Sequence, residues 1–275
     1  MMDPVCFTIL GRPVYWYGVF LALGFGAGLL HLARLDRREG RPPGFASDLA
    51  FWIIIGGIVG ARAAYVLGNW SEFAANPGLI VRVDKGGLVF YGGFFGAWLA
   101  AWIFAVLKHM PVLKLFDYTV SALPLGHAFG RIGCFLNGCC QGSPHAGWLS
   151  FTYPAKSAVW WAQLEDKLIA PSATAALPVW PVQLFEAAAN LVIYALLFAA
   201  YRRRHADGSI VVLYFLLYPA VRFTLEFLRG DLSGRVVVHG LTSAQWVSLV
   251  LFAVALVFAH ILRQRARHAD ANRPA

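Results

Sequence analysis

Long apolar runs, separated by short polar segments, dominate the pattern along the chain. Each run is close to the ~20 residues that a helix needs to cross the hydrocarbon core of a bilayer. This pattern predicts an all-α, polytopic membrane protein with about seven transmembrane helices. The predicted spans cover residues 15–34, 47–67, 89–107, 116–136, 181–201, 209–228 and 242–262.

The composition supports this fold class. The chain has 59% hydrophobic and 13% charged residues, whereas soluble domains carry about 25% charged residues. Lipid must therefore be its main solvent. The net charge of +9 can suggest nucleic acid, but the charges lie in short clusters between the apolar runs, as in membrane loops. We therefore expect no nucleic-acid partner.

The lysine and arginine counts of the loops predict the orientation, because cytoplasmic loops carry the excess of positive charge. The distribution favours an outer N-terminus and an inner C-terminus. We also expect the first run to be a retained helix, since basic residues follow it rather than a cleavage site. The predicted inner residues are Arg34, Arg37, Arg38, Arg41, Lys108, Lys114, Arg202, Arg203, Arg204, Arg263, Arg265, Arg267 and Arg273. The predicted outer residues are Arg12, Arg82, Lys85, Lys156, Lys167, Arg229 and Arg235.

Residues 1–275 are predicted to form a single membrane domain. The longest outer connection covers about 140–180 and contains Trp148, Trp160, Trp161 and Trp180. Tryptophan favours the headgroup layer of a bilayer. We therefore expect an arm that lies along the outer interface rather than a separate domain.

The densest group of reactive residues lies between Pro124 and Gly142, at the outer end of the fourth predicted span. His127 and Arg131 are four residues apart and share one helix face. An arginine at membrane depth is well suited to phosphate, because its planar fork binds two oxygens at once. The alternative is structural: Arg131 caps carbonyls or pairs with a carboxylate such as Asp117.

A second group lies on the sixth predicted span. Tyr218, Arg222 and Glu226 recur every four residues and therefore share a face. Arg222 and Glu226 can neutralise each other, as buried charges in lipid must. They can also act together on a ligand, with the glutamate aiming the guanidinium and a phosphate completing its coordination.

Two tyrosines begin predicted spans beside glycines. Tyr91 precedes Gly92 and Gly93, and Tyr17 precedes Gly18. Each tyrosine is either an interface anchor, which is the common case, or a hydrogen-bond donor to a lipid headgroup.

These segments carry a family resemblance. Residues 130–142, GRIGCFLNGCCQG, resemble the signature G-R-x-G-N-F-x-N-x-E-x-x-G of prolipoprotein diacylglyceryl transferases. Further segments are similar to motifs of the same family, in order along almost the whole chain. They are Trp16-Tyr17-Gly18, Gly60-Ala61-Arg62, the Tyr91–Gly96 segment (family H-G-G), Pro181–Glu186 (H-P-x-Q-L-Y-E), Arg222–Glu226 (R-F-x-x-E) and Gly240–Gln245 (G-L-T-x-x-Q).

The resemblance implies a seven-helix enzyme of the bacterial inner membrane whose active site opens toward the outer leaflet. Such an enzyme takes phosphatidylglycerol and the lipobox cysteine of a secreted prolipoprotein, forms a thioether to diacylglycerol and releases glycerol phosphate. No cofactor is implied. Carried over by position, Arg131 and Arg222 would bind the phosphate and headgroup. The other implied site residues are Tyr17, Gly92, Gly93, Asn137, Gly142, Tyr218 and Glu226.

Three departures from the family motifs affect the expected chemistry. Tyr91 replaces the H-G-G histidine, Cys134 the signature asparagine and Cys139 the signature glutamate. A tyrosine with a pKa near ~10 is a poor base at neutral pH, yet a thiol with a pKa of ~8.5 needs activation. We predict that His127 supplies the base, with a plain packing histidine as the alternative.

Three of the four cysteines are Cys134, Cys139 and Cys140. Packing of small, polarisable side chains is the interpretation we favour. A disulfide between Cys134 and either Cys139 or Cys140 is also possible, because the outer face of the membrane is oxidising. The spacing is not that of a usual zinc site, so no metal is expected. A covalent lipid relay lacks an identifiable base.

The sequence leaves three functions open. The first is transfer of a lipid group to a thiol. The second is a divergent transferase with another acceptor, which the three departures favour. The third is a transporter whose arginines line a path, although the inverted repeats typical of transporters are not evident.

Overall fold

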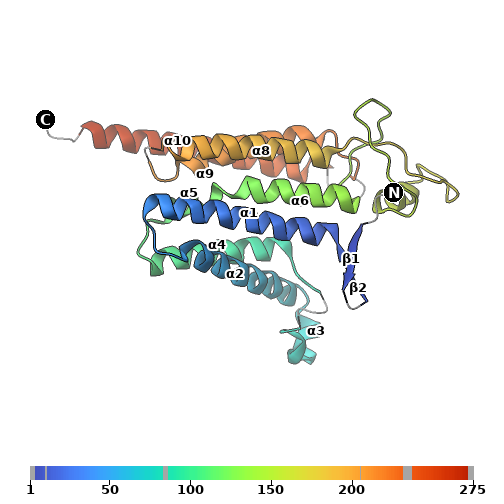
Figure 1. The fold of residues 1–275 in the computed structure, drawn as a ribbon, viewed down its shortest axis with the longest axis horizontal. Coiled ribbons are helices and arrows are strands. Elements are labelled where there is room, and N and C mark those ends of the chain that lie inside the picture. The colour runs from blue at the N-terminus through green and yellow to red at the C-terminus, as the bar shows by residue number, and fades with distance from the viewer. Residues whose placement is uncertain (1–3, 10, 83–85, 205, 232–236, 272–275) are drawn as a thin grey trace. The chain divides into compact units, whose positions relative to one another are not determined.

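The computed structural model describes residues 4–9, 11–82, 86–204, 206–231 and 237–271, and these are mostly helical (Figure 1). Lys85, Arg235 and Arg273, which enter the predicted charge distribution, lie outside the described residues. Among the described residues, six helices are long and apolar enough to cross a membrane. They are α1 (Trp16–Glu39), α2 (Phe45–Gly68), α4 (Phe90–Leu107), α8 (Val182–Tyr201), α9 (Ser209–Glu226) and α10 (Ser243–Ala271).

These six helices coincide with six of the predicted spans, so the predicted fold class, a polytopic helical membrane protein, is confirmed. The number of crossings and the N-out, C-in orientation stay predictions. The remaining span, 116–136, is not one helix as predicted. It is divided between α5 (Val112–Val120) and α6 (Leu123–Asn137).

Proline explains the break between α5 and α6. Pro124 lies in the first turn of α6, where its missing N–H costs nothing and its fixed φ suits a helix start. In the interior of a continuous helix the same ring would clash with the preceding turn. At its other end α6 is stopped by Gly138, which has a φ of 70° and closes the helix in the left-handed conformation.

Several short elements lie outside the predicted spans. An antiparallel hairpin precedes α1, and a second small hairpin precedes α10. These elements are β1 (Val5–Ile9), β2 (Arg12–Tyr15), α3 (Trp70–Ala75), the 3-10 helix η1 (Pro77–Leu79), α7 (Ala158–Glu165), β3 (Val237–Val238) and β4 (Leu241–Thr242).

The chain divides into two compact units, of residues 1–28 with 120–275, and of residues 29–119. In the first unit α6 packs on α8, α8 on α9, and α9 on α10 (Figure 1). In the second unit α2 packs on α4. The expected single membrane domain stays a prediction.

Glycines bring α2 and α4 into close contact. Gly56 and Gly60 face Gly92 and Gly96, so each helix presents two glycines spaced four apart. A Cβ on Gly96 would lie 2.2 Å from the carbonyl oxygen of Gly56, and one on Gly60 would lie 2.4 Å from that of Gly92. This small-xxx-small pattern lets helix backbones approach in lipid, where apolar side chains gain little from leaving the acyl chains.

Arg62 holds the loop that leads into α4. Its Nη2 donates to the Leu79 carbonyl at 2.5 Å and its Nε to that of Ile80 at 2.8 Å. Its Nη1 donates to the carbonyls of Gly86 and Gly87 at 2.9 and 3.1 Å. This buried arginine therefore donates to four backbone carbonyls of the loop and holds its two ends together.

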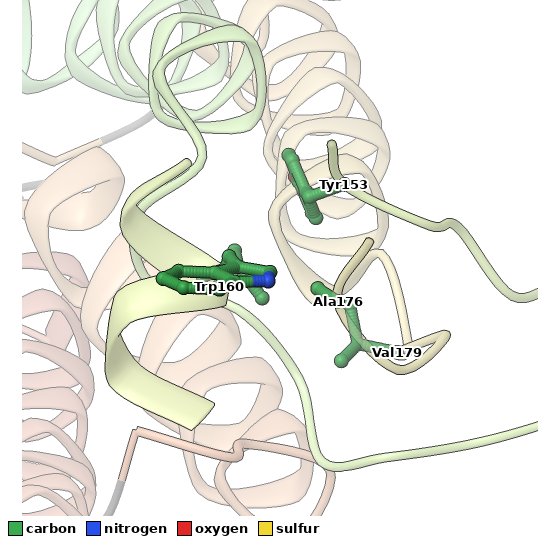
Figure 2. Packing of buried hydrophobic residues seen from close by; sticks show 5 residues of the cluster. Tyr153, Trp160, Ala176 and Val179 are labelled. Atoms are coloured by element: carbon green, nitrogen blue, oxygen red, sulfur yellow. The ribbon is translucent and has the colours of Figure 1, made fainter. Parts of the chain in front are cut away.

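The predicted outer arm has a hydrophobic core of its own (Figure 2). Tyr153, Val159, Trp160, Ala176 and Val179 are all buried in it. Within the arm, the Trp160 indole donates to the Ala173 carbonyl at 3.0 Å, and the Gln163 amide exchanges two hydrogen bonds with the Leu177 backbone. Trp148, in contrast, is 91% exposed. The arrangement of the arm along the membrane interface stays a prediction.

Candidate functional site

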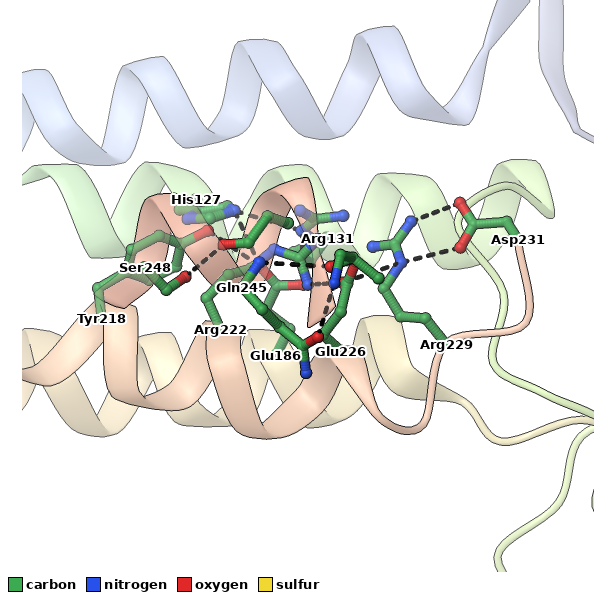
Figure 3. Close-up of polar contacts among 12 residues, drawn as sticks. His127, Arg131, Glu186, Tyr218, Arg222, Glu226, Arg229, Asp231, Gln245 and Ser248 are labelled. Atoms are coloured by element: carbon green, nitrogen blue, oxygen red, sulfur yellow. Dashed lines mark hydrogen bonds and ion pairs between the residues drawn. The ribbon is translucent and has the colours of Figure 1, made fainter. Parts of the chain in front are cut away.

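A buried carboxylate on α8 lies at the centre of the polar cluster in the first unit (Figure 3). Glu186 is 1% exposed. Its Oε2 lies 3.1 Å from Arg131 Nε, and its Oε1 accepts a hydrogen bond from the Tyr218 hydroxyl at 3.3 Å. Three helices, α6, α8 and α9, thus meet at one carboxylate. A buried charge of this kind needs such partners, because its desolvation is costly.

His127 lies against the same carboxylate. Its Nε2 accepts a hydrogen bond from Arg131 Nε at 3.2 Å and is 3.4 Å from Glu186 Oε1. Its ring lies 5.1 Å from that of Tyr218. The predicted helix face of His127 and Arg131 is therefore formed, and it faces polar groups.

A second arginine–carboxylate pair lies on α9. Arg222 Nη1 pairs with Glu226 Oε2, as their spacing predicts. Glu226 is 1% exposed, and its Oε1 accepts a hydrogen bond from the Thr242 hydroxyl at 2.9 Å. Thr242 and Gln245 form a capping box at the start of α10, with reciprocal hydrogen bonds of 2.9 and 3.3 Å. The cap of α10 thereby aims Glu226 at Arg222.

A third arginine completes the cluster just after α9. Arg229 Nε donates to Asp231 Oδ1 at 2.8 Å and lies 3.9 Å from Glu226 Oε2. Burial alone would lower the pKa of Arg229, but the hydrogen bonds and charge of Asp231 raise it above its usual value. Arg229 therefore remains a cation at every working pH.

Three arginines and three carboxylates make the cluster nearly neutral before any ligand arrives. Each carboxylate engages only part of its guanidinium. Among the described residues, both terminal nitrogens of Arg131, and Nε and Nη2 of Arg222, have no hydrogen-bond partner. Both arginines also act electrostatically on Tyr218 and His127, so they lie close to the same groups. The cluster therefore presents donors to one additional anion.

The end of α6 carries the remaining signature residues. Asn137 lines a cavity of about 240 Å³ that also touches Gly138, Tyr153 and Ser157. Gly142 lies where three segments meet. Its N–H donates to the Trp180 carbonyl at 3.1 Å, and an added Cβ would lie 2.4 Å from the same oxygen. Close packing therefore requires a glycine at position 142.

The other predicted residues are distributed between the two units. Tyr17 lies beside α6, since a Cβ on Gly133 would be 3.2 Å from the Tyr17 Cα. Tyr91, Gly92 and Gly93 belong to the second unit, where Gly92 contacts Gly60. Their predicted roles stay predictions.

Comparison with known proteins gives this geometry a context. Residues 4–261 match the sequence profile described as "Prolipoprotein diacylglyceryl transferase". The chain belongs to this family. One relative, a phosphatidylglycerol–prolipoprotein diacylglyceryl transferase from Xanthomonas euvesicatoria pv. vesicatoria, is 34% identical over 96% of this chain and 92% of its own length. Proteins of the same name from Dehalococcoides mccartyi and Clostridium tetani are 30% and 28% identical, over 98% and 96% of this chain.

The polar cluster contains three residues that the sequence did not predict to be at the site, and all three lie in segments that resemble family motifs. Glu186 ends the segment Pro181–Glu186, and Thr242 and Gln245 lie in Gly240–Gln245. Both segments resemble family motifs, but the sequence alone does not connect their polar side chains with the arginines. The available signal was a carboxylate inside an apolar run, which is a functional flag in a membrane helix.

Proposed function

We propose that this protein transfers the diacylglyceryl group of phosphatidylglycerol to the cysteine thiol of a prolipoprotein lipobox. Its family, which covers almost the whole chain, gives the reaction class. The observation that carries the proposal is the pair Arg131 and Arg222, each fixed by a buried carboxylate and each retaining donors for an anion. Phosphate suits these donors because the guanidinium fork binds two oxygens.

The transfer reaction determines what the arginines must do. The acceptor thiolate attacks the glycerol carbon of the diacylglyceryl group, a C–S bond forms, and the C–O bond to phosphate breaks. Glycerol phosphate leaves with one negative charge more than the phosphodiester carried. Donors that already surround the phosphate stabilise this developing charge more than the starting charge, which is the requirement for catalysis.

The acceptor thiol must first lose its proton, and His127 is the proposed base. Neutral His127 accepts from Arg131 at Nε2, and Glu186 Oε1 lies 3.4 Å from the same nitrogen. When Nε2 takes a proton it gives up the arginine bond and donates to Glu186 instead. Glu186 would then stabilise the imidazolium while Arg131 turns toward the departing phosphate. In this proposal Glu186 is a positioning residue.

We further propose that the protein resides in the bacterial inner membrane, with this cluster open toward the outer leaflet. The arm carries exposed Trp148 and Trp161, which suit a headgroup layer. A lipid headgroup and a secreted acceptor peptide would both reach the cluster from that side.

Purified protein in phosphatidylglycerol vesicles tests the proposal directly. The lipid carries a label in the glycerol backbone of its diacylglyceryl group, and the acceptor is a lipobox peptide. We expect the label on the peptide in a bond that resists thiol reductants and mild base, together with stoichiometric glycerol phosphate. A peptide with serine in place of the lipobox cysteine should stay unlabelled. Folded protein that leaves the cysteine peptide unlabelled would contradict the proposal.

A second candidate uses the same lipid with another acceptor. Tyr91, Cys134 and Cys139 depart from the family motifs, and these departures favour it. For this candidate, the same vesicles are supplied with a thiol or alcohol other than the lipobox peptide. Glycerol phosphate should then be released while the lipobox peptide stays unlabelled. Labelling of the lipobox peptide therefore separates the two candidates.

A further inference from the structure

Three thiols outside the arginine–carboxylate cluster converge on one point. The sulfur atoms of Cys134, Cys139 and Cys140 all lie within 4.8 Å of one another, and all three are free thiols. Cys134 is in the last turn of α6, and Gly138 then reverses the chain with a φ of 70°. Cys140 itself has a φ of 59°, which residues with a Cβ rarely adopt. The backbone therefore takes two left-handed positions to bring the thiols together.

We propose that Cys134, Cys139 and Cys140 form a three-coordinate site for a soft, monovalent cation with the chemistry of Cu(I). Thiolates select soft metals, and no imidazole or carboxylate joins the three thiols in the part of the chain that the structure describes. Structural zinc sites almost always take four ligands. A set of three sulfurs therefore suits a trigonal cation better than zinc.

The separations also fit a trigonal centre. With metal–sulfur bonds of about 2.3 Å, three thiolates around a planar centre are roughly 4 Å apart. The longest separation allowed by the structure is 4.8 Å. The side chains thus need to contract by under about 1 Å, which rotation about their Cα–Cβ bonds can supply.

The surroundings supply positive charge and rigidity. A monovalent cation with three thiolates carries two negative charges, and Arg131 and Arg229 both act electrostatically on Cys140. The Cys139 carbonyl accepts a hydrogen bond from the Gln183 amide at 2.7 Å. The next glycine, Gly142, is closely packed on Trp180. The turn is therefore held in place before any metal binds, and the ordering cost of binding is small.

Alkylation of the wild-type protein is the first test. The protein is reduced, freed of reductant without oxygen, and treated with a maleimide with or without one equivalent of Cu(I). We expect Cu(I) to protect Cys134, Cys139 and Cys140 at least tenfold, while Cys6, which lies outside the cluster, reacts unchanged. Peptide mass spectrometry reads each site. Equal alkylation rates with and without Cu(I) would overturn the proposal.

Competition with a chromogenic Cu(I) chelator is the second test. One equivalent per chain should move from the chelator to the protein, and a thiolate-to-metal absorption band should appear. Cys134→Ser and Cys140→Ser should each lower the affinity at least tenfold, and Cys6→Ser is the matched control. Ag(I), which resists redox change, should behave in the same way. Unchanged binding in both cluster variants would overturn the proposal. These readouts do not depend on the proposed transfer reaction.

Discussion

Arg131 and Arg222 each keep donors for a ligand because a carboxylate occupies only part of the guanidinium. We expect Arg131→Ala and Arg222→Ala to abolish transfer. Arg131→Lys and Arg222→Lys should remain slower by on the order of 10²-fold, because an ammonium lacks the planar fork. The measurement is the initial rate of peptide labelling in phosphatidylglycerol vesicles.

An exposed arginine supplies the control for these variants. Arg203 follows the end of α8, away from the polar cluster, and Arg203→Ala should keep the parent rate. All variants are compared at equal folded fraction, measured by size-exclusion chromatography. Near-normal turnover in either cluster alanine variant would remove that arginine from the mechanism.

His127 offers a pH-dependent prediction. Glutamine keeps its size and one hydrogen bond but has no basicity in this range. His127→Gln should lose most of its rate at neutral pH and recover part of it as the pH approaches the ~8.5 at which a free thiol ionises unaided. The pH–rate profile from pH 6 to about 9.5 is the measurement. If the variant and the parent have the same profile, His127 is a packing residue and Tyr91 becomes the stronger candidate.

Substitutions of Glu186 and Arg131 should affect stability and activity differently. Glu186→Gln leaves Arg131 as a buried cation without its carboxylate, which costs roughly 3 kcal/mol where a buried pair is broken. The thermal midpoint in detergent should fall. The double variant Glu186→Gln with Arg131→Gln should recover much of the midpoint but none of the activity. A double variant as unstable as the single one would show that Glu186 does not act through Arg131.

At the scale of helices and strands, the long apolar runs predicted most of the fold. A run that ends in polar residues on both sides forms one long helix, as residues 209–228 do in α9. The exception, 116–136, contains Pro124, whose effect on the backbone is local and does not lower the mean hydropathy. The hairpins and α7 were not predicted because each element is too short to show a clear strand or helix period.

The site was predicted less completely than the fold. Residues four apart on one helix, such as Arg222 and Glu226, follow from helical geometry alone. The pairing of Arg131 with Glu186 joins α6 to α8 and depends on how those helices pack. The convergence of Cys134, Cys139 and Cys140 depends on two left-handed backbone positions, and only the glycine was visible in the sequence.

The close contact between α2 and α4 predicts that even one added methyl group at Gly96 lowers the stability of the protein. Gly96→Ala places a methyl group about where the Gly56 carbonyl oxygen lies, 2.2 Å from the added Cβ. The helices must separate, at a cost of about 1–3 kcal/mol. Gly26→Ala on α1 is the matched control, since its Cβ meets nothing within 4 Å. We expect a lower thermal midpoint for Gly96→Ala alone, and equal midpoints would contradict the close contact.

At the scale of the whole molecule, the number of crossings depends on α5 and α6. If only the six long helices cross the membrane, both ends of the chain lie on the same side. A seventh crossing would place the two ends on opposite sides. Neither α5 nor α6 alone has the ~20 residues that one crossing needs. We therefore predict that the two short helices supply the seventh crossing together.

Reporter fusions at four positions test this topology. The N-out, C-in prediction follows from the basic residues in the inner loops. Fusions after Lys108, Arg204 and Arg267 should report cytoplasm. A fusion after Lys167, in the arm, should report the opposite side if α5 and α6 cross the membrane, as predicted, between Lys108 and the arm. The arginine–carboxylate cluster, which adjoins the arm through Gly142 and Trp180, would then face secreted substrates. Cytoplasmic signals at both Lys108 and Lys167 would make α5 and α6 a re-entrant pair. Such a result would bring the candidate site to the inner face, where a secreted lipobox cysteine cannot reach it.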